Sequence, residues 1–309
     1  MKRIILLALL AFLPVLPGRA QEDAQGWKAA YQRQVKYVGE AGTGVSLILD
    51  KWEKAFPEDP AVFHARHRYW LEKARSVSLQ PRAAARYMGA APALTLQDST
   101  GAPVHYFEVV SFSDSLFGRA SDAIRHAIAL APAALDYRAA YVSSLCAYEQ
   151  ESPDMAAAEL RALLDLHASR HPAWTWEGGK VGEADFCSLM QEFCYGFFKT
   201  GTPASYEAFR QVSERLAALW PRSAEYQNNL GSYWFVAKRQ AKRALKYYEK
   251  ALKLDAGNLS AAQNCVLLAR KEGDVRLEKK YLPLLISLTE DAQTRAALEA
   301  RARYLADRK

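Results

Sequence analysis

The sequence predicts an all-α fold, a solenoid of about six helix pairs plus a capping helix, with a small inserted β-hairpin. Apolar positions after residue 21 recur every three and four residues, which is the period of amphipathic helices. Most breaks in this pattern fall at Pro, Gly or Asp/Asn clusters. Similar segments also recur along the chain, and repetition of a helical unit favours a stack of helix pairs over a compact bundle.

The N-terminus predicts a signal peptide. A basic head at Lys2 and Arg3 precedes an apolar run over residues 4–16, and Gly18 and Ala20 supply small residues before Gln21. We expect cleavage between Ala20 and Gln21 and a periplasmic or secreted mature protein. The apolar run is shorter than the roughly 20 residues that span a bilayer, so no transmembrane segment is expected. No Cys follows the run, which argues against a lipid anchor. The alternative is an apolar N-terminal core helix.

Composition limits the remaining classes. The chain has 309 residues, 50% of them hydrophobic, which is ample for a packed core and too high for a disordered chain. Removal of residues 1–20 would lower the formal net charge from +7 to +4. The rest is uneven, because residues 21–200 are net acidic and residues 201–309 are net basic. Residues 21–309 are expected to form a single domain.

The helix pairs follow in order from the apolar periodicity and the breaks between its segments. They are expected at 24–38 with 45–56, 61–76 with 118–131, 134–149 with 154–168, 183–199 with 203–219, 223–237 with 241–255, and 259–272 with 275–287. A last helix at about 291–307 has a charged face and caps the stack.

The clearest repeats lie in residues 224–274. Their marker residues are Asn229, Leu230, Gly231, Trp234, Ala244, Tyr248 and Ala251, followed by Asn264, Cys265, Gly273 and Asp274. This pattern resembles the tetratricopeptide repeat (TPR), and similarity to an exported bacterial TPR protein implies an α-solenoid. The turn at 238–243 has one residue more than the corresponding turn of the repeat. Weaker matches to a second helix with its terminating Pro are Ile48, Trp52, Ala55 and Pro60, and Ala120, Ile124, Ala127 and Pro132.

Two segments interrupt the repeats. Residues 92–112 combine strand-like alternation, a turn cluster at 98–101 and a β-branched and aromatic run, which predicts a β-hairpin. The hairpin either covers an apolar groove of the solenoid or offers an edge to an extended peptide. Trp174 and Trp176 precede two Gly residues. They either fill the junction between helix pairs or line a pocket that binds a sugar or a peptide.

No catalytic, metal or cofactor motif is present. His167 and His171 lie four residues apart, but the Glu of the zinc-protease motif is missing between them. The sequence has no nucleophile elbow, phosphate loop or Cys-x-x-Cys motif. Its four Cys residues lie in apolar helical contexts and are expected to be buried. The alternative is that two of them form one inter-helix disulfide in an oxidising compartment. We therefore predict a non-enzymatic protein without cofactors.

The remaining candidates are binding surfaces. Lys242, Arg243, Lys246 and Lys250 crowd one helix face, which is either solvated or binds an anionic envelope surface or an acidic partner. Export argues against nucleic acid as the ligand of this face.

The resemblance implies a ligand groove along the first helices, where Asn229 and Asn264 occupy equivalent positions. These two side chains either contact a bound peptide or satisfy inter-helix turns. The carboxylate clamp of chaperone-binding TPRs is unsupported, because its Lys and Arg positions are held by Glu225, Asn228, Ser260 and Gln263.

Together these features predict an exported protein–protein interaction scaffold or assembly factor of the bacterial cell envelope, with an unknown protein partner. The alternative from a different class is an accessory binder of an anionic envelope polymer or glycan. An enzyme with an unrecognised site is the third hypothesis, and no residue supports it.

Overall fold

The computed structural model describes residues 18–306, and the described chain falls into two compact units. Unit 1 holds the chain up to Arg75 together with residues 112–132, and unit 2 holds residues 76–111 and the chain from Ala133 on. The expected single domain over residues 21–309 stays a prediction. Most of the predicted signal peptide, residues 1–17, lies outside the described residues, and its cleavage stays a prediction.

The described part of unit 1 contains two helix pairs. Helices α1 (Gly18–Val38) and α2 (Val45–Ala55) contact each other, as do α3 (Pro60–Ala74) and α4 (Asp114–Leu130). Asp59 caps α3 by accepting from the Ala61 backbone N–H, with Pro60 in the first helical turn, where no N–H is needed. Of the predicted second-helix residues, Trp52, Ile124 and Ala127 are buried, whereas Ile48 is half-buried and Ala55 is exposed. The pairs predicted at 24–56 and 61–131 are confirmed.

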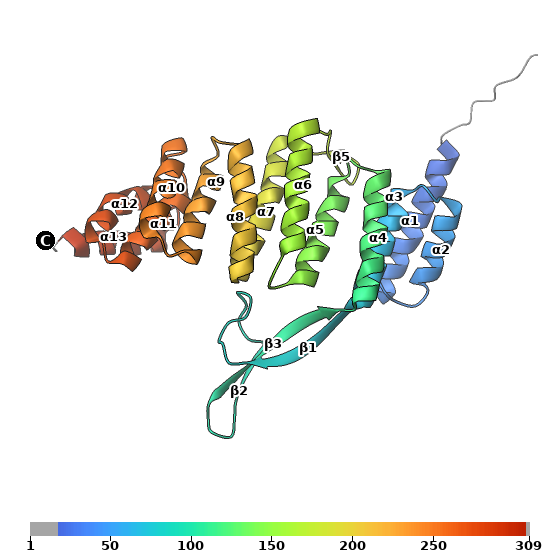
Figure 1. Cartoon of the computed structure of the whole chain (residues 1–309), viewed down its shortest axis with the longest axis horizontal. Helices are drawn as coiled ribbons and strands as arrows, with labels where there is room; N and C mark the ends of the chain where they lie inside the picture. Colours follow the sequence, from blue (N-terminus) through green and yellow to red (C-terminus); the bar gives the residue numbers. More distant parts are fainter. Residues whose placement is uncertain (1–17, 307–309) are drawn as a thin grey trace, which may run out of the picture. The chain divides into compact units, whose positions relative to one another are not determined.

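Unit 2 contains the other helices (Figure 1). They are α5 (Leu135–Glu149), α6 (Asp154–Arg170), α7 (Glu183–Thr200), α8 (Pro203–Leu219), α9 (Ala224–Ser232), α10 (Ala241–Leu254), α11 (Leu259–Glu272), α12 (Val275–Leu288) and α13 (Ala292–Ala306). The turns carry local stop and start signals: Gly273 ends α11 in the left-handed region, and Asp274 caps α12 through the Leu277 N–H. The predicted all-α fold of paired helices with a last capping helix is confirmed.

The repeat residues hold α9 and α10 together. Leu230, Ala244, Tyr248 and Ala251 are all buried, as the repeat pattern predicts. Gly231 lies against the ring of Tyr248, and a Cβ atom added at Gly231 would lie 2.4 Å from Tyr248 Cε1. This position therefore needs glycine for close approach of the two helices.

We expect Gly231→Ala to lower the free energy of unfolding by about 2 kcal/mol, because the added methyl overpacks a buried ring. Gly196→Ala is the matched control, since a Cβ at Gly196 in α7 meets nothing within 4 Å. The control should be neutral or slightly stabilising, because alanine is the better helix former. Urea denaturation followed by circular dichroism measures both. Equal midpoints for the two variants would contradict the proposed clash.

A π-helical turn, η1 (Tyr233–Ala237), follows α9. The hydrogen bond that defines this π-turn runs from the Lys238 N–H to the carbonyl of Tyr233, five residues earlier, at 3.3 Å. A π-turn accommodates one extra residue within a helix. The π-turn therefore accounts for the one residue by which the connection between α9 and α10 exceeds that of the repeat. Arg239, two residues after the π-turn ends, has φ +53°, in the left-handed region.

The insertion between α3 and α4 is a three-stranded sheet of order β1-β3-β2, with β1 (Arg75–Arg82), β2 (Leu94–Gln97) and β3 (Pro103–Phe112). The predicted hairpin is confirmed: β2 and β3 pair antiparallel, and Asp98 closes the turn by accepting from the backbone N–H groups of Thr100 and Ala102. Strand β1 was not predicted, and the expected helix over 61–76 ends at Ala74 instead. The chain turns into strand there because residues 76–80 alternate polar and apolar side chains and pair in the sheet.

One face of this sheet is uncovered. Val77, Leu79, Leu94 and Leu96 are exposed, whereas Phe107 and Val109 on the central strand are buried. In Figure 1 the turn between β2 and β3 points away from the helices of unit 2. The strands therefore pack through β3 and leave both edge strands open to solvent. The role of the hairpin as a cover or a recognition edge stays a prediction.

All four Cys residues are free. Cys194 and Cys265 are buried, as expected, whereas Cys146 and Cys187 are only half-buried, so the expectation of burial is wrong for these two. Burial raises the pKa of the Cys194 thiol to about 12. No helix within residues 18–306 combines the length and apolarity that crossing a membrane requires.

Candidate functional site

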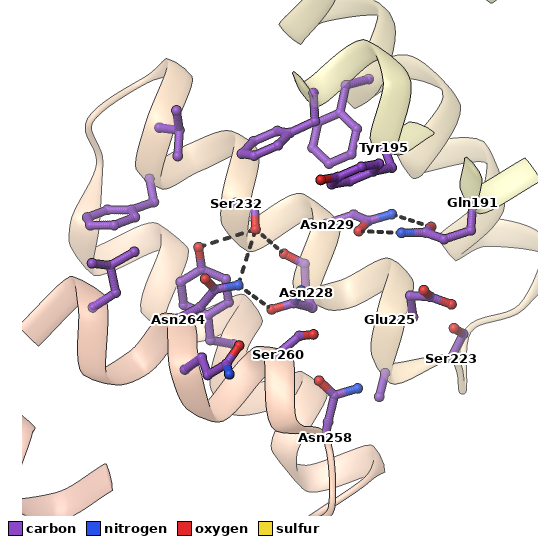
Figure 2. Close-up of a pocket in the computed structure, with 18 of the residues that line it drawn as sticks. Gln191, Tyr195, Ser223, Glu225, Asn228, Asn229, Ser232, Asn258, Ser260 and Asn264 are labelled. Carbon is purple, nitrogen blue, oxygen red and sulfur yellow. Dashed lines mark hydrogen bonds between the residues drawn. The ribbon is translucent and has the colours of Figure 1, made fainter. Parts of the chain in front are cut away.

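A groove of about 710 Å³ lies in unit 2 along the first helices of three successive pairs, α7, α9 and α11 (Figure 2). Its polar lining consists of Gln191, Tyr195, Ser223, Glu225, Asn228, Asn229, Ser232, Tyr248, Asp255, Asn258, Ser260, Gln263 and Asn264. Its apolar lining consists of Phe198, Phe209, Ala224, Phe235, Val236 and Leu267. Asn229 and Asn264 both belong to this groove, at the place where the repeat resemblance puts a ligand.

Amide side chains link neighbouring helices across the groove. Gln191 on α7 and Asn229 on α9 exchange two hydrogen bonds: Asn229 Nδ2 donates to Gln191 Oε1 at 2.8 Å, and Gln191 Nε2 donates to Asn229 Oδ1 at 3.2 Å. On the other side, Asn264 Nδ2 on α11 donates to Asn228 Oδ1 at 2.9 Å. Figure 2 shows a second bond from Asn264 to Ser232. The amides are therefore held in fixed orientations by one another.

This network leaves polar capacity unused. A side-chain amide carries two N–H donors and an acceptor with two lone pairs. Within residues 18–306 no hydrogen bond reaches Asn264 Oδ1 or starts from Asn228 Nδ2. Asn264 is half-buried and Asn228 is 9% exposed, and both line the groove, so these two atoms are the polar groups of the pair that remain for a molecule bound there. An acceptor and a donor on adjacent helices match the N–H and C=O groups of an extended peptide backbone.

The apolar part of the groove is open to solvent. Tyr195 on α7 is 63% exposed, and Val236 and Leu267 are also exposed. Val236 belongs to the π-turn, so the extra residue of this repeat contributes directly to the groove. Apolar groups beside a few polar groups of fixed orientation are the lining that ligand-binding pockets typically have.

The charge of the groove is negative. Glu225 and Asp255 line it, and none of its lining residues among those that the structure describes is a Lys, Arg or His. Partial burial raises the pKa of the Glu225 carboxyl above its ordinary value. The groove therefore favours a neutral or basic ligand segment over an acidic one.

The structure separates the two tryptophans. Trp174 is 3% exposed, and its indole N–H donates to His167 Nδ1 at 3.0 Å while its ring stacks on Phe186. It fills the junction between helices, which is the packing alternative. Trp176, on strand β4 (Thr175–Trp176), which pairs with β5 (Gly179–Lys180), is 42% exposed. A role of Trp176 in partner binding stays a prediction.

The basic residues Lys242, Arg243, Lys246 and Lys250 lie together on the outer side of α10, apart from the groove. His167, which the sequence pairs with His171, is engaged by Trp174 and by Glu183 at 3.2 Å. No group of three or more His, Cys, Asp or Glu side chains between residues 18 and 306 is arranged to hold a metal ion.

Sequence reasoning missed Gln191, Asn228 and Ser232 as members of the network. The repeat pattern marks Asn228 only as a position that lacks a clamp Lys or Arg, whereas in the structure Asn264 bonds to Asn228 rather than to Asn229. The available signal was a polar residue inside an apolar helical run, as at Gln191 between Met190 and Phe193. That signal cannot reveal the partner, because Gln191 and Asn229 are 38 positions apart.

Two examples represent the solved structures that are similar to this chain. One is PilF of Pseudomonas aeruginosa, with 21% identity over 62% of this chain and 78% of that chain and a TM-score of 0.39. The other is the flexible tandem repeat domain of a bacterial cellulose synthase subunit, with 16% identity over 94% of this chain and 99% of that chain and a TM-score of 0.27. No protein-family model and no curated protein sequence matches the chain. The fold and the groove therefore rest on this chain's own helices and side chains.

Proposed function

We propose that this protein is a non-enzymatic scaffold that captures an extended peptide segment of a partner protein in the groove along α7, α9 and α11. The observation that carries this proposal is the interlocked amide network with an unused acceptor on Asn264 and an unused donor on Asn228. Fixed amides bind a peptide backbone without a large entropic cost, since their orientations are set before the ligand arrives.

The lining of the groove also favours particular side chains in the bound partner segment. Tyr195, Val236 and Leu267 offer apolar contact, while Glu225 and Asp255 favour basic groups. We infer a partner segment that alternates apolar and basic or neutral residues, because alternate side chains of an extended chain point to opposite sides. Export and a place in the bacterial cell envelope belong to the same proposal and rest on the predicted signal peptide, with Ala20 and Gln21 at its cleavage site.

A random peptide library displayed on phage, panned against the protein, tests the proposal. For a selected peptide we expect Tyr195→Ala and Asn264→Ala each to weaken binding about tenfold, which corresponds to 1.4 kcal/mol. Tyr195 is an exposed side chain, so its loss should leave stability unchanged. Fluorescence anisotropy of the labelled peptide measures the affinity, and thermal unfolding verifies that each variant is folded.

Gln211→Ala on α8 is the matched control, because this amide does not line the groove. It should bind the selected peptides as the unaltered protein does. If panning yields no peptides, or if the selected peptides bind the groove variants and the control equally well, the groove is not the capture site.

A further inference from the structure

Helix α10 has two faces of different character. Ala244, Tyr248 and Ala251 are buried against the rest of unit 2. The outer face carries a depression of about 490 Å³ lined by Lys242, Arg243, Lys246, Tyr247 and Lys250. We call the four cations of this set the cationic strip. Lys242, Lys246 and Lys250 follow one another at four-residue intervals, so they lie on one side of the helix about 6 Å apart along its axis.

The charge of the cationic strip is not neutralised. All four side chains are exposed, and none forms an ion pair with another residue in the part of the chain that the structure describes. Neighbouring cations behave differently: Lys238 pairs with Glu207 at 2.7 Å, and Lys280 pairs with Glu249 at 2.8 Å. Like charges at four-residue spacing repel one another. A bound anion would remove this repulsion.

Aromatic groups accompany the cationic strip. The guanidinium carbon of Arg243 lies 3.3 Å from the ring centroid of Trp234, which orients this long side chain. Tyr247 is half-buried among the lysines and offers part of its ring to the depression. Three of the four cations are lysines, whose ammonium groups attract an oxyanion as point charges. Their four-residue spacing repeats the positive charge along the helix, as a polymer with an anionic group on each repeating unit requires. The partly exposed ring of Tyr247 among them offers a face on which a sugar ring can stack.

We propose that the cationic strip on α10 is a docking site for a linear polysaccharide with an anionic group on its repeating sugar, for which polygalacturonate is the probe. The site is separate from the peptide groove and has the opposite charge, since the groove is lined by Glu225 and Asp255 and by no cation. A polyanion is therefore repelled from the groove and attracted to the outer face of α10. One helix pair, α9 and α10, thus contributes to two binding surfaces of different specificity.

Binding of polygalacturonate oligomers tests this proposal, with the fully methyl-esterified polymer as the uncharged counterpart of the same backbone. We expect the protein to bind the charged form and not to bind the methyl ester. Its affinity for the charged form should fall as the salt concentration rises. The triple variant Lys242→Glu, Lys246→Glu, Lys250→Glu should lose at least tenfold in affinity. The charge-matched control Lys180→Glu, Lys271→Glu, Arg276→Glu alters exposed cations outside the strip and should change affinity less than about twofold.

Several results would overturn the proposal. These are equal losses in the strip and control variants, equal binding of the methyl ester, and no binding of polygalacturonate at all. Tighter binding of poly(dT), polyglutamate or phosphatidylglycerol vesicles would assign the strip to a nucleic acid, an acidic protein or a lipid surface instead. Peptides selected on the groove should bind the strip variant unchanged, so failure of this proposal is distinguishable from failure of the groove.

Discussion

Trp174→Ala should lower the free energy of unfolding by about 3 kcal/mol, since truncation of a buried tryptophan leaves a cavity that neighbours fill only in part. Trp174 packs its ring parallel to Phe186, with ring centroids 5.8 Å apart, and donates to His167 Nδ1. Its removal leaves that buried nitrogen without its donor, which adds a desolvation cost. Urea denaturation followed by circular dichroism measures the loss.

Trp176→Ala is the matched control for this prediction. Trp176 lies two residues further on and is 42% exposed, so its truncation should change the free energy of unfolding by less than about 0.5 kcal/mol. Similar losses in the two variants would show that Trp174 does not fill a packed junction. The pair also decides whether the two tryptophans act together, as a shared ligand pocket would require.

Glu278→Gln should lower the free energy of unfolding by about 2 kcal/mol and loosen α13, because it removes one partner of a buried ionic cluster. The Glu278 side chain on α12 is 2% exposed. It accepts from Arg270 Nε on α11 at 2.6 Å and from Arg301 Nη2 on α13 at 2.8 Å. The cluster therefore ties three helices together. The two arginines are more than a third exposed, which is why we expect less than the full cost of a buried unpaired charge.

The pH dependence gives a second measure of the same cluster. Hydrogen bonding from Arg301, and then from Arg270, holds the pKa of Glu278 below its ordinary value of 4.5. The carboxylate therefore contributes its full stabilisation above pH 4.5 and loses it as pH falls through the lowered folded-state pKa. The difference in stability between the unaltered protein and Glu278→Gln should shrink below that pH.

Hydrogen exchange of α13 should accelerate in Glu278→Gln at neutral pH. Glu272→Gln, at the exposed end of α11, is the control and should leave both exchange and unfolding unchanged. A stability difference that stays constant down to the acid limit would show that Glu278 is not the titrating group.

The helices could be predicted closely from the sequence, because their limits are local. Pro60 and Pro203 begin helices, Gly273 ends one, and Asp274 begins the next. The spacing of Ala244, Tyr248 and Ala251 likewise identifies the buried side of α10 without any partner in view. Strand β1 was missed because its pairing partner β3 begins some twenty residues further along the chain.

The candidate site was predicted in part. Repeat spacing places Asn229 and Asn264 on first helices, and both line the groove. It does not place the bonds that orient them, because a shift of one residue in helix packing would pair Asn264 with a different neighbour. The one-residue excess after α9 looked like an imperfection of the repeat, yet its π-turn brings Phe235 and Val236 into the groove lining.

The helix pairs, the place of the hairpin and the basic side of α10 can be predicted from the sequence, since each depends on periodicity and on residues close together in the chain. Three other properties become visible only in the folded chain: Trp174 is buried, Gln191 pairs with Asn229, and the cationic strip forms no ion pair within the described residues. These properties depend on which helix surfaces pack against each other. That packing joins residues far apart in the sequence, so a local sequence pattern does not predict it.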